Sequence, residues 1–317
     1  PLEFYSPIGN WKASFVGLGD WNLDIHHYYH AGAGRLYLGS GGSLSRKLTR
    51  TENGNSLIPS QDGSEVYIFN SAGKHLETRR GLTGDLIYHF AYDANGRLAS
   101  VTDIDGNKTT FTRTNGKLTS ITSPYGQITK VTTNTFGQLL TITNPAGEAH
   151  QMTYFANNGL MKSFRPPGGQ PSQFQYTSSG TLTRDTNPLG GFLNLRDGDR
   201  SPSSREIFLT SALGREKRIS ISSPYGLEGY YQRDTTNSAG YQTTRVESDA
   251  YETSGGQDEL NVSTFLKDDI RFGEGLKTAY QTVVGVDSTQ VTVDRVQCVI
   301  DNGTLFGVSS YQESYTQ

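Results

Sequence analysis

The chain contains very little sulfur, because its 317 residues include one cysteine, Cys298, and two methionines. A single cysteine excludes a disulfide within the chain and an all-cysteine metal site. No apolar run approaches the roughly 18 residues of a membrane-spanning helix, and the sequence shows no convincing amphipathic helix. The 28 basic and 31 acidic side chains are interspersed, so no basic surface for nucleic acid or an anionic membrane is predicted. The chain opens at Pro1 without the start of a secretory signal, and we therefore expect a piece or processed product of a longer protein.

Glycine, in contrast, is plentiful, and five of the 37 glycines recur at a nearly constant interval. Gly96, Gly116, Gly137, Gly159 and Gly180 are separated by 20, 21, 22 and 21 residues. A fixed period of this size predicts a repeat architecture, in which each unit buries its apolar face by stacking on its neighbours.

Apolar and β-branched residues occupy constant positions around each glycine. Two residues after it lie Leu98, Leu118, Leu139, Met161 and Leu182. Four residues before it lie Tyr92, Thr112, Thr133, Phe155 and Tyr176, and six before it lie Phe90, Thr110, Val131, Thr153 and Phe174. Positions four and six before the glycine share one face of a strand. Five residues after it lie Val101, Ile121, Ile142, Phe164 and Asp185. Positions two and five are an odd number apart, so either a β-bulge intervenes or both faces carry apolar residues.

Turn residues separate these strand-like segments. A second glycine follows each first one, at Gly106, Gly126, Gly147, Gly169 and Gly190. The Asn-Gly pairs at Asn95, Asn115 and Asn158 are typical of tight hairpins, which need positive φ. Each unit is therefore predicted to be strand, turn, strand, turn, and the fold class to be all-β with antiparallel strands.

The regularity divides the chain into three predicted sections. Residues 1–64 form an N-terminal β segment, with strand-like alternation around Trp21 and Leu36. Residues 65–196 hold the repeats, with Gly73 in a divergent first copy, and residues 197–317 form a divergent β continuation.

The clearest copy, Phe-Ala-Tyr-Asp-Ala-Asn-Gly-Arg-Leu-Ala-Ser-Val-Thr-Asp at 90–103, resembles the YD repeat of the Rhs family. That family includes bacterial Rhs polymorphic toxins, the C components of insecticidal toxin complexes, wall-associated proteins and teneurins. Further segments at 17–39, 73–84, 210–215 and 271–273 also resemble family stretches. The motif residues are Tyr92, Asp93, Gly96, Arg97 and Leu98, with their counterparts at Gly116, Leu118, Gly137, Leu139, Gly159, Met161, Tyr176, Gly180 and Leu182.

The resemblance implies a sheet that curves or spirals into part of a hollow β-shell. In the toxin members this shell encloses a C-terminal effector until delivery, so we expect an exported bacterial protein, secreted or at the cell surface. Its partners would be the remainder of the shell, the enclosed effector and components of secretion systems or cell surfaces. No match to the self-cleaving aspartate motif of such shells is present. We therefore expect the chain to form part of the shell wall and to have no catalytic activity.

A surface-binding module is the alternative interpretation. The 18 tyrosines suit recognition of sugars or proteins, because they combine an aromatic face with a polar tip. Some relatives act at cell surfaces, and the resemblance therefore also allows an adhesin.

Other residues suggest chemistry only weakly. His26, His27 and His30 could suggest a metal site, but neighbouring residues of a strand point to opposite faces, which favours packing. Asp103 to Asn107 has calcium-binding side chains without the spacing of a calcium loop, and the same residues suit a turn. Glu206 with Asp185 or Asp199 would need to be within about 5–9 Å for glycoside hydrolysis. We predict no catalytic residue, no cofactor and no metal ion.

Overall fold

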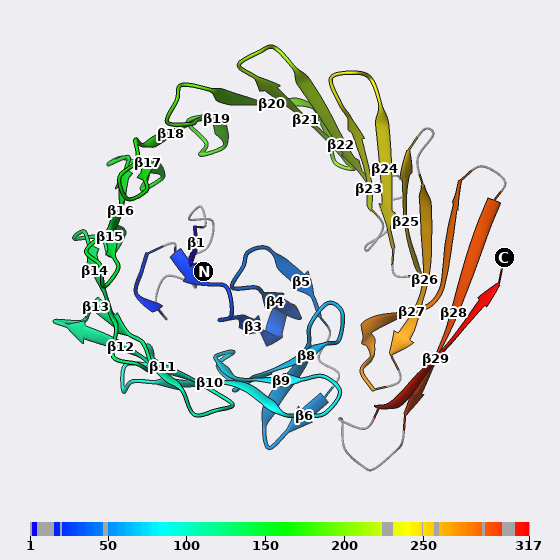
Figure 1. Ribbon diagram of the computed structural model, residues 1–317, viewed down its shortest axis with the longest axis horizontal. Coiled ribbons are helices and arrows are strands. Elements are labelled where there is room, and N and C mark those ends of the chain that lie inside the picture. The colour runs from blue at the N-terminus through cyan, green and yellow to red at the C-terminus, as the bar shows by residue number, and fades with distance from the viewer. Residues whose placement is uncertain are drawn as a thin grey trace. The chain divides into compact units, whose positions relative to one another are not determined.

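The computed structural model describes residues 2–4, 16–19, 21–46, 50–223, 231–248, 250–256, 260–269, 271–286, 289–299 and 308–316. The chain divides into two compact units, and Figure 1 traces it from blue at the N-terminus to red at the C-terminus. Unit 1 comprises Pro1–Ser172 and Glu274–Leu276, and unit 2 comprises Gln173–Gly273 and Lys277–Gln317. The predicted section boundaries at 64/65 and 196/197 stay predictions.

Among its described residues, unit 1 contains short antiparallel strands and a turn of 3-10 helix, η1 (Ala31–Ala33). β1 pairs with β2, β3 to β5 form a small sheet, and from β6 to β17 each strand pairs with the next. The strands are β1 (Leu2–Phe4), β2 (Trp21–Leu23), β3 (Tyr28–His30), β4 (Arg35–Tyr37), β5 (Ser43–Ser45), β6 (Arg50–Glu52), β7 (Asn55–Pro59), β8 (Glu65–Phe69), β9 (His75–Arg80), β10 (Leu86–Tyr92), β11 (Leu98–Asp103), β12 (Lys108–Thr114), β13 (Lys117–Thr122), β14 (Ile128–Thr133), β15 (Leu139–Thr143), β16 (Ala149–Tyr154) and β17 (Met161–Arg165).

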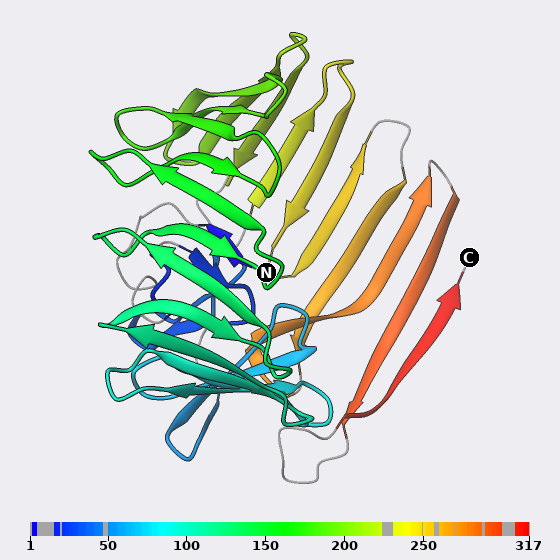
Figure 2. The same ribbon diagram turned by 60° about the vertical axis from the view of Figure 1, so that its left-hand side comes forward.

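Unit 2 also consists of antiparallel strands, and several of them, such as β20 and β27, are longer than those of unit 1 (Figure 2). The strands are β18 (Ser172–Tyr176), β19 (Leu182–Thr186), β20 (Phe192–Ser201), β21 (Ser204–Ser211), β22 (Glu216–Ser222), β23 (Tyr231–Thr236), β24 (Gln242–Glu247), β25 (Tyr251–Gly256), β26 (Asn261–Asp269), β27 (Gly273–Val286), β28 (Thr289–Val299) and β29 (Val308–Thr316). The predicted all-β class with antiparallel strand-turn-strand units is therefore confirmed.

The repeat glycines form the turns, as their spacing predicts. Gly96 has φ +74°, a left-handed conformation that costs an L-residue roughly 1–2 kcal/mol. At Asn115, φ is also positive, and Asn115 and Gly116 make a two-residue turn between paired Thr114 and Lys117. The prediction of the same tight turn at Asn95 and Asn158 is wrong, because these residues lack positive φ and belong to longer loops.

A β-bulge at the same place in each repeat explains the odd spacing between the apolar positions two and five residues after the turn glycine. Tyr92 pairs with Leu98 and Ala91 pairs with Ser100, so Ala99 has no partner across the strand pair. The equivalent unpaired residues are Thr119, Leu140, Lys162 and Thr183. Because each bulge adds one residue, the apolar positions two and five after the glycine lie on one face of the sheet.

Two of the predicted columns of strand residues are wrong at some repeats, because the turns differ in length. The buried residues of β12 and β16 are Phe111 and Met152, instead of Thr110 and Thr153. The short turn at Gly116 moves the register by one residue in one direction, and the long turn at Gly159 moves it in the other. The same shifts put Arg113 and Tyr154, in place of Thr112 and Phe155, opposite Leu118 and Met161.

The N-terminal strands of unit 1 lie against the concave side of its β6–β17 sheet (Figure 1). Tyr29, Leu36, Ile58, Tyr67 and Phe69 form a core between β3–β4 and β7–β8. Burial of such large apolar side chains contributes roughly 1.5–3 kcal/mol each. The small N-terminal sheet is thus an integral layer of unit 1.

Unit 2 contains a buried ion pair near the end of β26. The Asp269 carboxylate accepts hydrogen bonds from the backbone N–H of Arg271 at 2.7 Å and from its Nη2 at 3.0 Å. Both side chains are almost inaccessible to solvent. The segment at 271–273, which resembles a family stretch, therefore begins in a turn whose buried charged groups, Arg271 and Asp269, pair with each other.

Candidate functional site: the inner row of repeat contacts

Three side chains at equivalent positions each join their own repeat to the repeat before it. They stand opposite the second residue after the turn glycine and bind a backbone carbonyl oxygen at that position of the preceding repeat. We call them the inner row: Tyr92 Oη binds His75 O (2.7 Å), Arg113 Nη1 binds Leu98 O (2.6 Å) and Tyr154 Oη binds Leu139 O (2.7 Å). The bulge exposes these carbonyls to the side chains because it interrupts the ladder beside them.

The inner row also holds the N-terminal segment on the concave face. Its members bind the segment as follows: Tyr92 Oη to His26 Nε2 (2.9 Å), Arg113 Nη2 to Val16 O (2.8 Å) and Tyr154 Oη to Trp21 Nε1 (3.0 Å). Thr133 occupies the row position between Arg113 and Tyr154. Beside this repeat Gly19 packs directly on the turn backbone, where a Cβ would lie 2.9 Å from the Cα of Gln138. The segment therefore contacts four successive repeats.

A second series of contacts connects the turns. After three of the turn glycines, the next residue donates from its side chain to a backbone carbonyl in the turn of the following repeat. The bonds run from Arg97 Nη1 to Gly116 O (2.8 Å), from Lys117 Nζ to Asn134 O (3.1 Å) and from Gln138 Nε2 to Gly159 O (2.8 Å). We call this series the turn ladder.

Asp93 orders the turn from which Arg97 reaches out. Its carboxylate accepts the backbone N–H groups of Asn95 and Arg97 at 3.0 and 2.9 Å, and the Nε of Arg97 at 2.9 Å. These hydrogen bonds, led by that from the Arg97 backbone, lower the pKa of the Asp93 carboxyl. In this repeat Asp93 shapes the turn, Arg97 bridges to the next one, and Tyr92 bridges to the previous one.

Three buried histidine rings lie where the N-terminal segment meets β9 and β10. His75 Nδ1 accepts the backbone N–H of His27 at 3.2 Å, while its Nε2 contacts the carbonyl oxygen of Glu77 at 3.0 Å. His27 Nδ1 accepts the N–H of Gly39 at 2.9 Å. Desolvation by burial lowers the pKa of His26 to about 3 and holds the pKa of His75 well below its usual value. The rings of His26 and His75 are therefore neutral structural groups at physiological pH.

The structure places the predicted repeat residues in three environments. Leu98, Leu118, Leu139 and Met161 are buried in one column, and Leu182 of unit 2 is half-buried. Gly96, Gly116, Gly137, Gly159 and Gly180 occupy the turns. Tyr176 stands opposite Leu182, the position that Tyr92 has opposite Leu98. The predicted role of these residues as the structural residues of the repeat stays a prediction.

Sequence reasoning missed Arg113, Tyr154 and His75. Arg113 and Tyr154 lie one residue from the column predicted for Tyr92, because the turns differ in length. His75 follows Gly73 by two residues, like Leu98 after Gly96, and this spacing was the available signal.

The residues considered for other chemistry have local partners. His30 is exposed and its Nδ1 accepts the N–H of Ala33. Asp103 orders its own turn through the N–H groups of Asp105 and Asn107, and Glu206 pairs with Arg218. Within the described part of the chain, no three His, Cys, Asp or Glu side chains are grouped to hold a metal ion. In the same ranges, no helix has both the length and the apolar character needed to cross a membrane.

Part of this chain is similar in sequence to known proteins. Mouse Teneurin-4 is 33% identical over 177 residues, which cover 53% of this chain and 6% of that protein. Drosophila melanogaster Teneurin-m is 48% identical over 54 residues, or 16% of this chain and 2% of that protein. The chain thus spans a small part of the length of these relatives.

The chain also matches a family model over most of its length, and it has a weak likeness to a solved structure. The crystal structure of TcdB2-TccC3-Cdc42 aligns with 89% of this chain and 19% of that chain, at 11% identity and a TM-score of 0.37. The family model described as Teneurin YD-shell matches residues 53–309. This match covers most of the chain, including every repeat with an inner-row residue, and confirms the YD-repeat resemblance. The chain therefore belongs to the Teneurin YD-shell family.

Proposed function

We propose that this chain is a non-catalytic wall segment of an exported YD shell, which encloses a C-terminal polypeptide such as a toxin or effector. The observation that carries the proposal is the inner row. Tyr92, Arg113 and Tyr154 join successive repeats and at the same time hold a non-repeat segment of the chain on the concave face. A wall built in this way already receives polypeptide on its inner surface.

The contacts between repeats bind backbone carbonyl oxygens, and Arg113 also binds the N-terminal segment through the main chain of Val16. These backbone contacts place few demands on sequence, whereas His26 and Trp21 are held through their side chains. Joining repeats by hydrogen bonds worth about 0.5–1.5 kcal/mol each also supports a continuous wall. The remainder of the shell would be its first partner, with secretion or cell-surface components as further partners.

Intact mass measurement of the protein from its native source tests the proposal. Under denaturing conditions, a shell polypeptide longer than 317 residues and a separate co-purifying C-terminal polypeptide are expected. The second polypeptide should resist protease until the shell is denatured. A native polypeptide that ends near Gln317 with nothing co-purifying would contradict enclosure.

A cell-surface adhesin is the second candidate, and the exposed turn residues favour it. Tyr125 and Phe136 are 81% and 83% exposed, at tips of hairpin turns where they do not contribute to a core. A glycan and receptor-ectodomain binding screen with the chain tests this function. Saturable binding that is lost in a Tyr125→Ser, Phe136→Ser double variant would support the adhesin, and no binding by the unaltered chain would reject it.

A further inference from the structure

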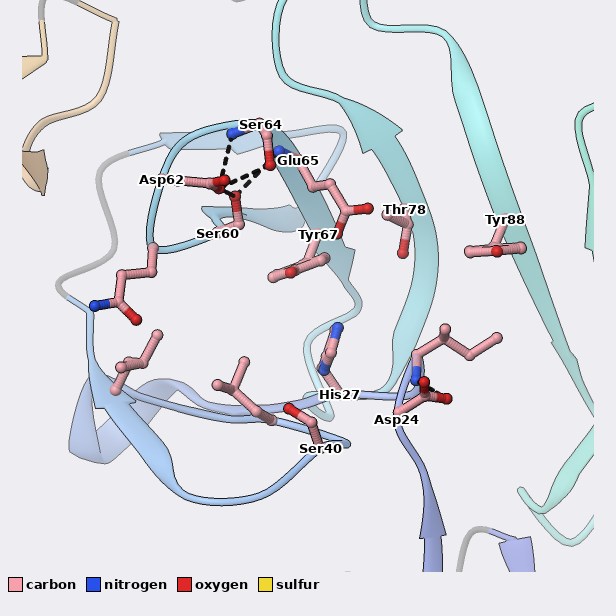
Figure 3. Close-up of a pocket in the computed structure, with 14 residues that line it drawn as sticks. Asp24, His27, Ser40, Ser60, Asp62, Ser64, Glu65, Tyr67, Thr78 and Tyr88 are labelled. Carbon is pink, nitrogen blue, oxygen red and sulfur yellow. Dashed lines mark hydrogen bonds between the residues drawn. The ribbon is translucent and has the colours of Figure 1, made fainter. Parts of the chain in front are cut away.

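A cavity of about 360 Å³ lies in unit 1 between the N-terminal sheet and strands β8 to β10. Figure 3 shows Asp62 and its serine partners on one side of this cavity, Ser40 on the opposite side, and the rings of Tyr67 and His27 between them. The volume falls in the range of about 300–1,000 Å³ that is typical of small-molecule sites. It lies apart from the inner row and from the turn ladder.

The charge of the lining has one sign. Asp24, Asp62 and Glu65 contribute carboxylates, and none of the described residues that line the cavity is a lysine or an arginine. Burial alone would raise the pKa of the Asp62 carboxyl, but hydrogen bonds from Ser60 and Ser64 outweigh this effect and lower it. The carboxylate is therefore charged, and the cavity favours a positively charged occupant.

Aromatic and aliphatic side chains form the remaining walls. The rings of Tyr67 and His27 are 4.3 Å apart, and Tyr88 also lines the cavity. Burial, followed by the neighbouring Glu65 carboxylate, raises the pKa of Tyr67, so its ring stays uncharged. Arg46 interacts electrostatically with Tyr67 without lining the cavity. Aromatic faces beside carboxylates stabilise organic cations.

The aliphatic wall distinguishes between kinds of cation. Ile25, Leu38 and Leu44 line the cavity together with the charged groups, and they offer contact to an alkyl stem. A bare metal ion does not fit, because the described carboxylates and histidines are not close enough together to coordinate one. We propose that this cavity binds an ammonium or guanidinium group on an aliphatic stem, supplied by a lysine or arginine side chain of a polypeptide or by a free polyamine.

Titration of the isotope-labelled full chain with small probes, followed by NMR, tests the proposal. Nα-acetyl-arginine methylamide should shift the amide signals of Ser64 and Glu65 and the methyl signals of Leu38 and Leu44 in a saturable manner. The neutral isostere Nα-acetyl-citrulline methylamide should bind at least about fivefold more weakly, because it lacks the charge. A parallel titration uses spermidine. Tighter binding of spermidine than of the arginine probe identifies a polyamine as the ligand. Tighter binding of the arginine probe identifies a polypeptide side chain as the ligand.

Variants assign the binding to this cavity. Glu65→Gln should weaken binding of the arginine probe on the order of fivefold, whereas Glu148→Gln, the same change at a distant exposed turn, should not. Tyr88→Leu provides a second variant if Glu65→Gln disturbs the fold. Equal binding of the citrulline probe, or affinity unchanged in both Glu65→Gln and Tyr88→Leu, would overturn the proposal. This inference does not depend on the shell function and can fail or succeed separately from it.

Discussion

The phenol of Tyr92 donates a hydrogen bond to the backbone carbonyl oxygen of His75, 2.7 Å away, across the boundary between two repeats. The tyrosine of the YD motif is therefore a connecting residue, with a hydroxyl that also binds His26 of the N-terminal segment.

Removal of this hydroxyl in Tyr92→Phe should destabilise unit 1 by about 1–3 kcal/mol, because a buried carbonyl and a buried imidazole lose their partner. Denaturant unfolding measures the loss, and hydrogen exchange should show faster exchange in β2 and β3. Tyr125→Phe, at an exposed turn, is the matched control and should change stability by less than about 0.5 kcal/mol. Equal stability of the two variants would contradict a connecting role for Tyr92.

The buried leucine column should resist truncation and charge. Leu118 is 1% exposed, so Leu118→Ala should cost about 2–5 kcal/mol, and Leu118→Asp should cost more because an unpaired charge would enter the core. Leu189→Ala removes the same atoms from a side chain that is 96% exposed and should be nearly neutral. Thermal unfolding of the three variants checks this order, and an unchanged midpoint for Leu118→Asp would invalidate the register.

Two turn glycines should respond differently to alanine. Both have positive φ, but a Cβ on Gly73 would lie 2.1 Å from the carbonyl oxygen of Tyr29, whereas a Cβ on Gly126 meets open space. Gly126→Ala should therefore cost only the conformational strain of about 1–2 kcal/mol. Gly73→Ala should cost more and should release β3 from the isolated bridge at Lys74, which hydrogen exchange of β3 can detect. A smaller loss for Gly73→Ala than for Gly126→Ala would be inconsistent with this packing.

Acid should loosen the N-terminal segment. The pKa of unfolded histidine is about 6.5, and that of folded His26 is lowered to about 3 by burial. Between these values the unfolded chain binds a proton that the folded chain does not, so stability is complete above about pH 6.5 and falls as the pH decreases. The loss approaches about 1.4 kcal/mol per pH unit for each such histidine.

Denaturant unfolding between pH 7 and pH 4.5 measures this slope. The control His30→Gln changes an exposed ring and should keep the slope of the unaltered chain, whereas His26→Gln should reduce it. A stability that is independent of pH over this interval would show that the histidines are not held in the neutral form.

Much of the local fold was predictable from residue spacing. The glycine period located the turns, and the leucine column located buried positions such as Leu98 and Leu139. The bulge was left open because spacing alone does not distinguish an extra residue from a two-sided apolar strand. The pairing of Ala91 with Ser100 beside that of Tyr92 with Leu98 provided the answer.

The inner row could not be predicted from the sequence, and the reason is physical. Its register depends on turn length, so counting from Gly116 or Gly159 selects Thr112 or Phe155, one residue from Arg113 and Tyr154. Its contacts with the N-terminal segment join residues such as Val16 and Arg113, which no periodic pattern relates.

The route of the N-terminal segment also has a consequence for biosynthesis. The partner of Trp21 is Tyr154, 133 residues later in the chain. At roughly 5–20 residues per second, the ribosome needs about 7 to 27 s to make that partner. The earliest-made part of unit 1 must therefore wait, with its aromatic side chains exposed, until four repeats have emerged. A nascent chain in this interval is a natural client for a chaperone, because Trp21 can close its contact only after the strands up to Tyr154 have been made.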